Sequence, residues 1–113
     1  MEAHLFHIVD ADEWDGQRAQ GRYAPDSYAA EGFIHLSTMD QVIATAGRHF
    51  AGRQNLVVLR IDPALPRADV VYEESGDEQF PHLYGQLNLD AVIGVIGLPV
   101  SADGSFERPA GLD

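Results

Sequence analysis

Asn-Leu-Val-Val-Leu-Arg-Ile, residues 55–61, is the clearest strand of the sequence. Its apolar residues fall on both faces, a pattern typical of a strand that is covered on both sides. Pro63 and Pro66 follow it and interrupt regular backbone hydrogen bonding. We therefore expect this strand to occupy the centre of a sheet, with the hydrophobic core around it.

The segments on either side of this strand predict a mixture of helices and strands. The spacing of apolar residues predicts strands at Ala3–Val9, Phe33–Leu36, Val70–Glu73 and Ala91–Val100, and helices at Ala11–Gln20 and Thr38–Phe50. A loop is expected at Gly21–Gly32, an acidic turn at Ser75–Gln79 and a compact aromatic segment at Phe80–Gly85. This order predicts an α+β fold with small mixed or antiparallel sheets and two short helices.

Both expected helices begin with a capping signal. Asp10 precedes the first helix with Glu13 three positions later, and Thr38 precedes the second with Gln41 in the same relation. Trp14 is expected to anchor the first helix in the core. The other residues expected to be largely buried are Ile34, Leu36, Val42, Ile43, Ala46, Phe50, Val58 and Val95.

Composition and charge restrict the classes of function. The chain has 113 residues, 45% of them hydrophobic, which indicates a single domain spanning residues 1–113. Its 18 acidic and 7 basic residues give a net charge of −11, which disfavours nucleic acid and anionic membranes as partners. Cysteine is absent, no signal peptide is visible, and no apolar run approaches the roughly 20 residues of a membrane span. These features predict an acidic, cytoplasmic protein.

Three of the five histidines occupy positions that do not readily suit a purely structural role. His7 and His35 lie in the middle of expected strands, and His82 follows a proline in the aromatic segment. A single strand histidine is most often a satisfied core residue, whereas two on separate strands favour a site. No metal site is predicted, because the spacing does not place ligands side by side, although three histidines assembled in space would suit a metal.

Hydroxyl and carboxyl groups near these histidines supply further candidates. Ser37 lacks the flanking glycines of a hydrolase nucleophile, which favours a ligand-binding role. Glu73 and Glu74 are adjacent on a strand, so at most one of them can act as acid or base, and a solvated surface role is the alternative. Tyr28 belongs to a loop rich in side chains that hydrogen-bond or stack, and such loops often line a site.

Two blocks of the sequence resemble the signatures of a known family. They are Glu31-Gly-Phe-Ile-His-Leu-Ser37 and Phe80-Pro-His-Leu-Tyr-Gly85. They are similar to blocks of a bacterial domain-of-unknown-function family, domain of unknown function 952, and the resemblance covers nearly the whole chain. It implies an ADP-ribosyltransferase-like fold, which is that of the ADP-ribosylation superfamily, without an established activity.

A more distant resemblance, to RNA 2′-phosphotransferases, implies a chemistry. Leu5-Phe-His7 is similar to the first strand of those enzymes, and Ile34-His-Leu-Ser37 to a later one. The resemblance implies that His7 and His35 hold NAD and that Ser37 lines the nicotinamide-ribose side. The position of the superfamily's third catalytic residue falls near His82 or Tyr84.

The leading hypothesis is an enzyme that transfers ADP-ribose from NAD. His7 and His35 would orient NAD as catalytic residues, and Glu73 or Glu74 would stabilise the oxocarbenium-like cation. The ligand-binding positions implied beside them are Ser37, Tyr28, His82 and Tyr84. The alternative is a non-catalytic small-ligand-binding or regulatory module on the same fold. Ile8-Val9 favours it, because the phosphotransferases have a glycine after the first histidine.

Overall fold

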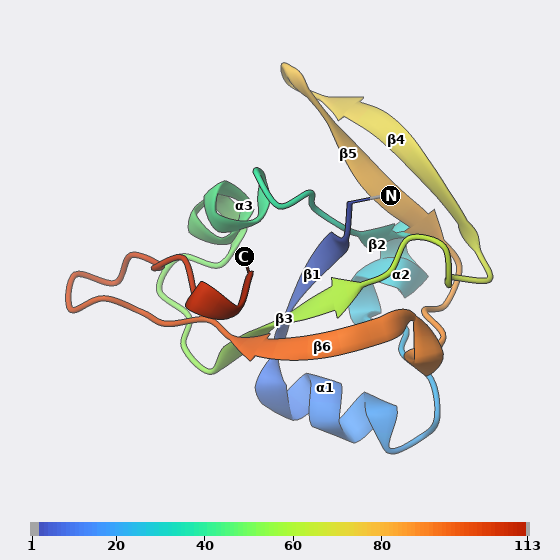
Figure 1. Cartoon of the computed structure of the whole chain (residues 1–113), viewed down its shortest axis with the longest axis horizontal. Coiled ribbons are helices and arrows are strands. Elements are labelled where there is room, and N and C mark those ends of the chain that lie inside the picture. The colour runs from blue at the N-terminus through green and yellow to red at the C-terminus, as the bar shows by residue number, and fades with distance from the viewer. Residues whose placement is uncertain (1–2, 113) are drawn as a thin grey trace.

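Two antiparallel sheets of three strands each form the framework of the chain, in a computed structural model that describes residues 3–112 (Figure 1). The first sheet has the order β1 (Leu5–Asp10), β3 (Leu56–Ile61) and β6 (Val92–Gly97). The second has the order β2 (Ile34–His35), β5 (Glu78–Tyr84) and β4 (Asp69–Ser75). The α+β class predicted from the sequence is confirmed, and both sheets are antiparallel.

Helices connect these strands. In the described part of the chain they are α1 (Ala11–Arg18), α2 (Asp26–Glu31), α3 (Val42–His49) and the short 3-10 helices η1 (Leu89–Ala91) and η2 (Ala110–Leu112). The Asp10 carboxylate caps α1 by accepting hydrogen bonds from the backbone N–H groups of Asp12 and Glu13, as the capping signal predicts. No helix within residues 3–112 is long and apolar enough to cross a lipid bilayer.

β3 is the central strand of its sheet, as its apolar sequence predicts. It pairs with β1 from Leu5 opposite Ile61 to Asp10 opposite Leu56, and with β6 along its other edge. Val58 and Leu59 point to opposite faces, and neither has exposed surface. Both faces of this central strand are therefore buried.

Two hydrophobic clusters cover these faces. Along β1, Leu5 and Val9 belong to one cluster and Phe6 and Ile8 to the other, as the alternation of a strand requires. The first cluster is completed by Trp14, Tyr23, Ile34, Leu36, Leu59, Ile61, Leu83, Leu87 and Ala91. The second is completed by Val42, Ala46, Leu56, Val58, Leu98 and Leu112. The second sheet thus packs through the first cluster, and α3 packs through the second.

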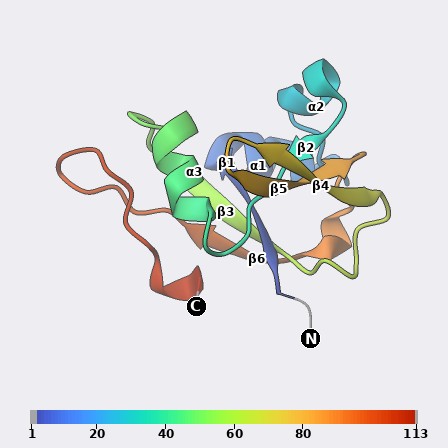
Figure 2. The same ribbon diagram turned by 90° about the horizontal axis from the view of Figure 1, so that it is seen from above.

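A backbone bridge brings the segment after β2 beside β1. The Phe6 N–H donates to the Ser37 carbonyl at 2.8 Å, and the Ser37 N–H donates to the Phe6 carbonyl at 2.7 Å. The two views of the fold place the β4–β5 hairpin above the β1–β3–β6 sheet (Figures 1 and 2). His7 and His35 consequently lie on neighbouring backbone segments.

Two expectations for the loops are wrong. The segment Gly21–Gly32 is not a single loop, because α2 forms within it after Pro25 and ends at Gly32, whose φ of 85° breaks the helix. The expected number of two helices is wrong for the same reason. α2 has only six residues, which is too short to show a clear helical spacing of apolar residues. The expected aromatic segment, except for Gly85, and the last two residues of the acidic turn, Glu78 and Gln79, belong to β5, where Pro81 masks the strand pattern.

The second helix and one core residue also differ from expectation. α3 begins at Val42 because residues 38–41 form a turn, in which the Gln41 side chain accepts a hydrogen bond from the Thr38 N–H at 3.0 Å. Ile43 and Phe50 are only half-buried. Val95 is 50% exposed although it lies opposite the buried Leu59, because β6 is an edge strand of its sheet. The remaining expected core residues are buried.

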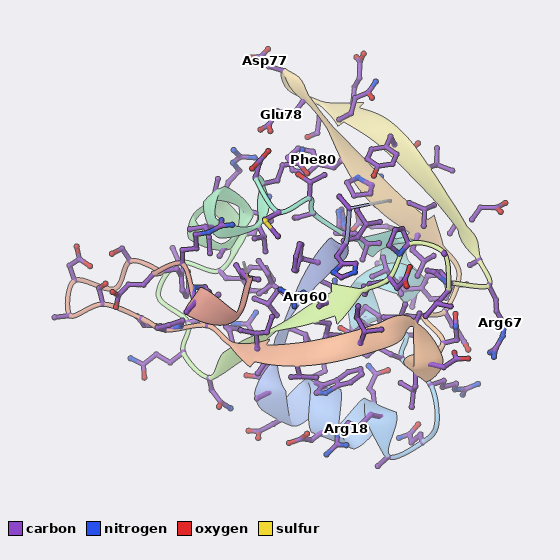
Figure 3. All side chains as sticks on the ribbon, in the orientation of Figure 1. Arg18, Arg60, Arg67, Asp77, Glu78 and Phe80 are labelled. Atoms are coloured by element: carbon purple, nitrogen blue, oxygen red, sulfur yellow. The ribbon has the colours of Figure 1, made fainter. Side chains whose placement is uncertain are left out.

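Gln41 also fastens the far end of the β4–β5 hairpin to the start of α3. Its side chain is buried, and its Nε2 donates to the Gln79 carbonyl at 2.8 Å and to the Glu78 carboxylate at 3.4 Å. Figure 3 shows Asp77 and Glu78 at the projecting end of the hairpin and Phe80 further in. One buried amide thus holds the turn before α3 and the end of the hairpin together.

Candidate functional site

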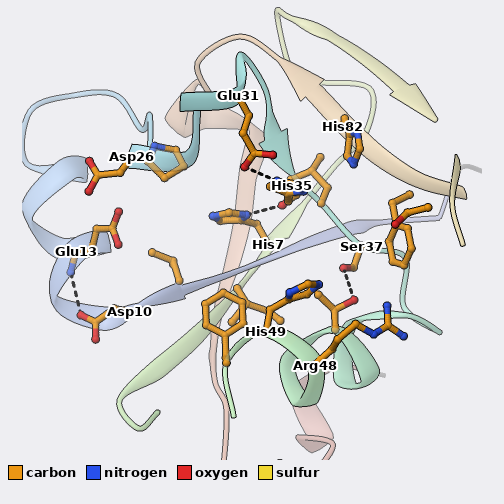
Figure 4. A pocket seen from close by; sticks show the side chains of 18 of the residues that line it. His7, Asp10, Glu13, Asp26, Glu31, His35, Ser37, Arg48, His49 and His82 are labelled. Atoms are coloured by element: carbon orange, nitrogen blue, oxygen red, sulfur yellow. Dashed lines mark hydrogen bonds and ion pairs between the residues drawn. The ribbon is translucent and has the colours of Figure 1, made fainter. Parts of the chain in front are cut away.

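A pocket of about 680 Å³ lies where β1, β2, α3 and the β4–β5 hairpin meet (Figure 4). Its size is that of a typical small-molecule site. The residues that line it are His7, Ile8, Val9, Asp10, Glu13, Tyr23, Pro25, Asp26, Glu31, His35, Leu36, Ser37, Thr45, Arg48, His49, Phe50, Arg53, Glu74, Ser75, Phe80 and His82.

The pocket brings together some of the residues expected from the sequence and leaves others outside. Its lining includes His7, His35, Ser37 and His82. The remaining candidates, Tyr28, Glu73 and Tyr84, are not among the lining residues. Tyr28 packs, partly buried, against the first hydrophobic cluster. Glu73 lies behind the lining residue His82, which it contacts, and Tyr84 contacts Glu73.

His7 is held inside the protein by both of its ring nitrogens. Nδ1 lies 2.7 Å from the His35 carbonyl oxygen and Nε2 lies 2.7 Å from the Tyr23 hydroxyl. A carbonyl only accepts, so Nδ1 carries the proton and Nε2 accepts from the tyrosine. Burial lowers the pKa of His7 from 6.5 to about 4, outweighing the opposing effect of the His35 carbonyl. His7 is therefore neutral at physiological pH, and it forms a wall of the pocket with no ring nitrogen left free.

His35 and His82 face each other across the β2–β5 pair. They are opposite one another in the strand register, and their ring centroids lie 5.2 Å apart in an edge-to-face arrangement. Phe33 contacts both rings, stacking on His82 with a centroid distance of 4.2 Å and meeting His35 edge-on at 4.7 Å. The phenylalanine thereby fixes the orientation of the two imidazoles.

Each of these two imidazoles is paired with a carboxylate. His35 Nε2 lies 3.0 Å from a carboxylate oxygen of Glu31 in α2, and His82 Nδ1 lies 2.8 Å from one of Glu73 in β4. The Tyr84 hydroxyl donates to the same oxygen of Glu73. Hydrogen bonds from Tyr84 and then His82 lower the pKa of Glu73, and the bond to Glu73 raises the pKa of Tyr84. Glu73 is consequently ionised and orients His82 from outside the pocket.

Hydroxyl groups from two elements meet on another part of the lining. The Ser37 hydroxyl donates to the Thr45 hydroxyl of α3 at 3.3 Å. The backbone of Ser37 is fixed by its bridge to Phe6, and α3 is fixed by its packing on the sheet. The two hydroxyls are therefore held in fixed positions in the pocket wall.

Charged side chains of both signs line the pocket. Figure 4 shows Asp10, Glu13 and Asp26 grouped on one side, and Arg48 of α3 on the other. Burial, followed by repulsion from Asp26 and Asp10, raises the pKa of Glu13, while Arg53 attracts it and acts in the opposite direction. Within residues 3–112, no three histidine or carboxyl side chains are grouped so that they could hold a metal ion.

Comparison with known proteins identifies the family of the chain. The model of a family described as a protein of unknown function, DUF952, matches residues 8–95. The chain belongs to this family. The predicted membership of domain of unknown function 952 is thus confirmed, and the two blocks that indicated it contribute His35, Ser37 and His82 to the pocket. No curated protein matches the chain.

Solved structures extend this family assignment to three dimensions. The crystal structure of protein CC0527 from Caulobacter crescentus is 36% identical, has a TM-score of 0.85 and covers 93% of this chain and 94% of that one. A double mutant of the same protein gives the same values. The solution structure of CC0527 is 39% identical, with a TM-score of 0.77 and 90% of each chain covered. This member of the DUF952 family therefore shares the fold of CC0527 over nearly its whole length.

Sequence reasoning missed several residues of this DUF952 pocket. Tyr23 and Glu31 line the pocket, and Phe33 packs on two of its histidines. The Tyr23–His7 and Phe33–His82 contacts join distant positions that no local motif indicates, whereas Glu31 lies only four positions before His35. Arg48 carried a weak signal, since it lies on the polar side of an amphipathic helix that directly follows the His35 strand. Glu74, rather than Glu73, is the neighbouring carboxylate that lines the pocket.

Proposed function

We propose that the pocket binds a small nucleotide that carries both a cationic ring and phosphate groups, with NAD as the first candidate. The observation that carries this proposal is that one 680 Å³ pocket groups the carboxylates of Asp10, Glu13 and Asp26 on one side and has Arg48 on the other, with Arg53 also in the lining near Glu13. The overall charge of −11 disfavours large polyanions, but it leaves room for one local contact between an arginine and a phosphate.

The chemistry of NAD matches the distribution of these groups. Its positively charged nicotinamide ring suits the side formed by Asp10, Glu13 and Asp26, and its pyrophosphate suits the planar fork of the Arg48 guanidinium. The hydroxyls of Ser37 and Thr45 can exchange hydrogen bonds with a ribose or with the carboxamide. Each part of the ligand thus has a complementary group within the same pocket.

Transfer of ADP-ribose from the bound NAD is the catalytic form of this proposal. Two antiparallel three-stranded sheets beside one pocket, with His7 on the first and His35 on the second, support an ADP-ribosyltransferase-like fold and agree with the resemblance to RNA 2′-phosphotransferases. Cleavage of the nicotinamide–ribose bond needs negative charge near the developing cation. Glu74 lines the pocket and is better placed for this role than Glu31 or Glu73, which are bonded to His35 and His82.

A non-catalytic binding or regulatory module is the alternative, and the bonding of His7 favours it. Both ring nitrogens of His7 are occupied by Tyr23 and by the His35 carbonyl, so His7 offers a ligand packing surface rather than a hydrogen bond. In this form of the proposal the pocket recognises the nucleotide and leaves its bonds intact.

Calorimetric titration with NAD tests the binding proposal. We expect saturable binding that weakens by about tenfold or more in Arg48→Met, because a charge-assisted hydrogen bond contributes roughly 1.5–3 kcal/mol. Arg67→Met is the matched control, since Arg67 pairs with Asp90 and does not line the pocket. Absence of binding at millimolar NAD would reject NAD as the ligand. Release of nicotinamide by the bound state would separate the transferase from the binding module.

A further inference from the structure

We propose that His35 and His82 form an acid–base pair that hydrolyses a phosphodiester bond of a small nucleotide held in this pocket. The inference rests on the proposed nucleotide binding and adds a reaction to it that differs from ADP-ribosyl transfer. It is carried by the contact between the two imidazoles, by the carboxylate behind each of them, and by an arginine in the same lining.

The carboxylates determine which ring nitrogen of each histidine is left for a substrate. A carboxylate accepts hydrogen bonds, so the neutral forms carry their protons on Nε2 of His35, toward Glu31, and on Nδ1 of His82, toward Glu73. Nδ1 of His35 and Nε2 of His82 have no partner among residues 3–112. Two neighbouring imidazoles in one pocket therefore each keep one nitrogen that can take up or release a proton.

The surroundings of the two histidines assign different roles to them. The side chain of His82 is 12% exposed and is held by Glu73, which the Tyr84 hydroxyl keeps in the ionised form. A carboxylate behind an imidazole stabilises the imidazolium that forms when the ring accepts a proton, which suits His82 to the role of base. The side chain of His35 is 50% exposed, so solvent has access to its ring, which suits it to the role of acid.

The reaction balances with water as the second substrate. Nε2 of His82 accepts a proton from water as the water oxygen forms a bond to phosphorus. The bond between phosphorus and the leaving alkoxide oxygen breaks, and Nδ1–H of protonated His35 donates its proton to that oxygen. The products are a phosphomonoester and an alcohol. Solvent then removes the proton from His82 and returns one to His35.

A phosphodiester is the substrate class that needs both members of such a pair. Its leaving group is an alkoxide, a strong base that must be protonated as it departs, whereas a pyrophosphate bond releases a phosphate that is stable without a proton. Arg48 in the same lining supplies the charge that binds the phosphodiester anion. The titratable groups in contact with the pair are Glu31 from α2 and Glu73 from β4, and Tyr84 from β5 contacts Glu73.

Two substrates distinguish the acid from the base. The full chain would be assayed with 2′,3′-cyclic AMP, whose leaving group needs a proton, and with bis(4-nitrophenyl) phosphate, whose phenolate does not. We expect turnover of both, with a bell-shaped pH profile for the cyclic nucleotide. His82→Gln should lower both rates by about 100-fold or more, and His35→Gln should lower only the rate with the cyclic nucleotide by that factor. Arg67→Met should leave both rates unchanged.

Glu73→Gln keeps the test decisive if a histidine variant fails to fold. Its amide still occupies the position behind His82 but no longer stabilises the imidazolium, so both rates should fall about tenfold and the acidic limb of the pH profile should move. Wild-type protein that binds the cyclic nucleotide by calorimetry without hydrolysing either substrate would overturn this inference and leave the binding proposal intact. Full turnover in His35→Gln and His82→Gln would overturn it as well. Absence of both binding and hydrolysis of the cyclic nucleotide would reject this inference, whereas the titration with NAD decides the binding proposal separately.

Discussion

The Nε2 atom of His7 lies 2.7 Å from the hydroxyl oxygen of Tyr23, and both residues are almost completely buried. His7 belongs to β1, whereas the backbone of Tyr23 pairs with Leu87 at the other end of the sequence. Through Nδ1, the same ring also reaches the His35 carbonyl of β2. One imidazole therefore connects three segments that are distant in the sequence.

Tyr23→Phe should destabilise the protein by about 1–3 kcal/mol, because it leaves the buried Nε2 of His7 without a donor. Chemical denaturation monitored by circular dichroism measures the loss. Tyr72→Phe is a suitable control, since Tyr72 is 51% exposed, and it should change stability by less than about 0.5 kcal/mol. Equal stability of the two variants would mean that the buried hydrogen bond contributes nothing.

Stability should fall as the pH decreases from about 6.5 to about 4. The unfolded chain binds a proton at His7 below its ordinary pKa of 6.5, whereas burial in the folded state lowers that pKa to about 4. The stability that depends on neutral His7 is therefore fully present above pH 6.5 and is lost by about pH 4. At 1.36 kcal/mol per pKa unit, it amounts to roughly 3 kcal/mol. Unfolding free energies measured across this pH range test the prediction. In His7→Asn, the slope of the unfolding free energy against pH should correspond to about one proton fewer taken up on unfolding.

The same substitution on two strands tests the assignment of the core. Val58→Ala in β3 removes two methyl groups from a site with no exposed surface, and it should cost about 2 kcal/mol in the free energy of unfolding. Val95→Ala in the edge strand β6, at a position that is 50% exposed, should cost less than about 0.5 kcal/mol. Comparable losses would show that β6 is covered in solution.

Gln41→Ala should loosen the β4–β5 hairpin. The variant loses the hydrogen bonds of the buried amide to the Gln79 carbonyl and the Thr38 N–H, which together should cost about 1–3 kcal/mol. Amide hydrogen exchange should accelerate in the outer half of β5 and remain slow in β3. Gln86→Ala at an exposed position serves as the control. Unchanged exchange in β5 would mean that strand pairing alone holds the hairpin.

The parts of the fold that the sequence predicted correctly are those with strong local signals. β3 has apolar residues on both faces, and α1 has a capping aspartate followed by a buried Trp14. α2 was missed because it has only six residues. Val95 was misjudged because an apolar strand at a sheet edge has the same sequence as a covered one, and only the strand order reveals the difference.

The site was predictable only where residues face one pocket directly. His7, His35, Ser37 and His82 attracted attention by their type and their strand positions, and all four line it. The function of Glu73 depends on its partner nine positions away across the β4–β5 pair, which the sequence does not reveal because Pro81 obscures that strand. Pairings of this kind are tertiary, and they become visible only when the strands are in register.

The hydrogen bonds of the Gln41 side chain to the end of the β4–β5 hairpin have a kinetic consequence. Glu74, Ser75, Phe80 and His82 of the β4–β5 hairpin form part of the pocket, and the outer end of this hairpin is fastened by one amide. We expect that breaking the bonds of that amide allows the hairpin to swing outward while the inner strands stay paired. The lifetime of these bonds then sets how fast a ligand enters and leaves, whereas the residues deeper in the pocket set its equilibrium affinity. Residence time and affinity are therefore expected to vary independently in this protein.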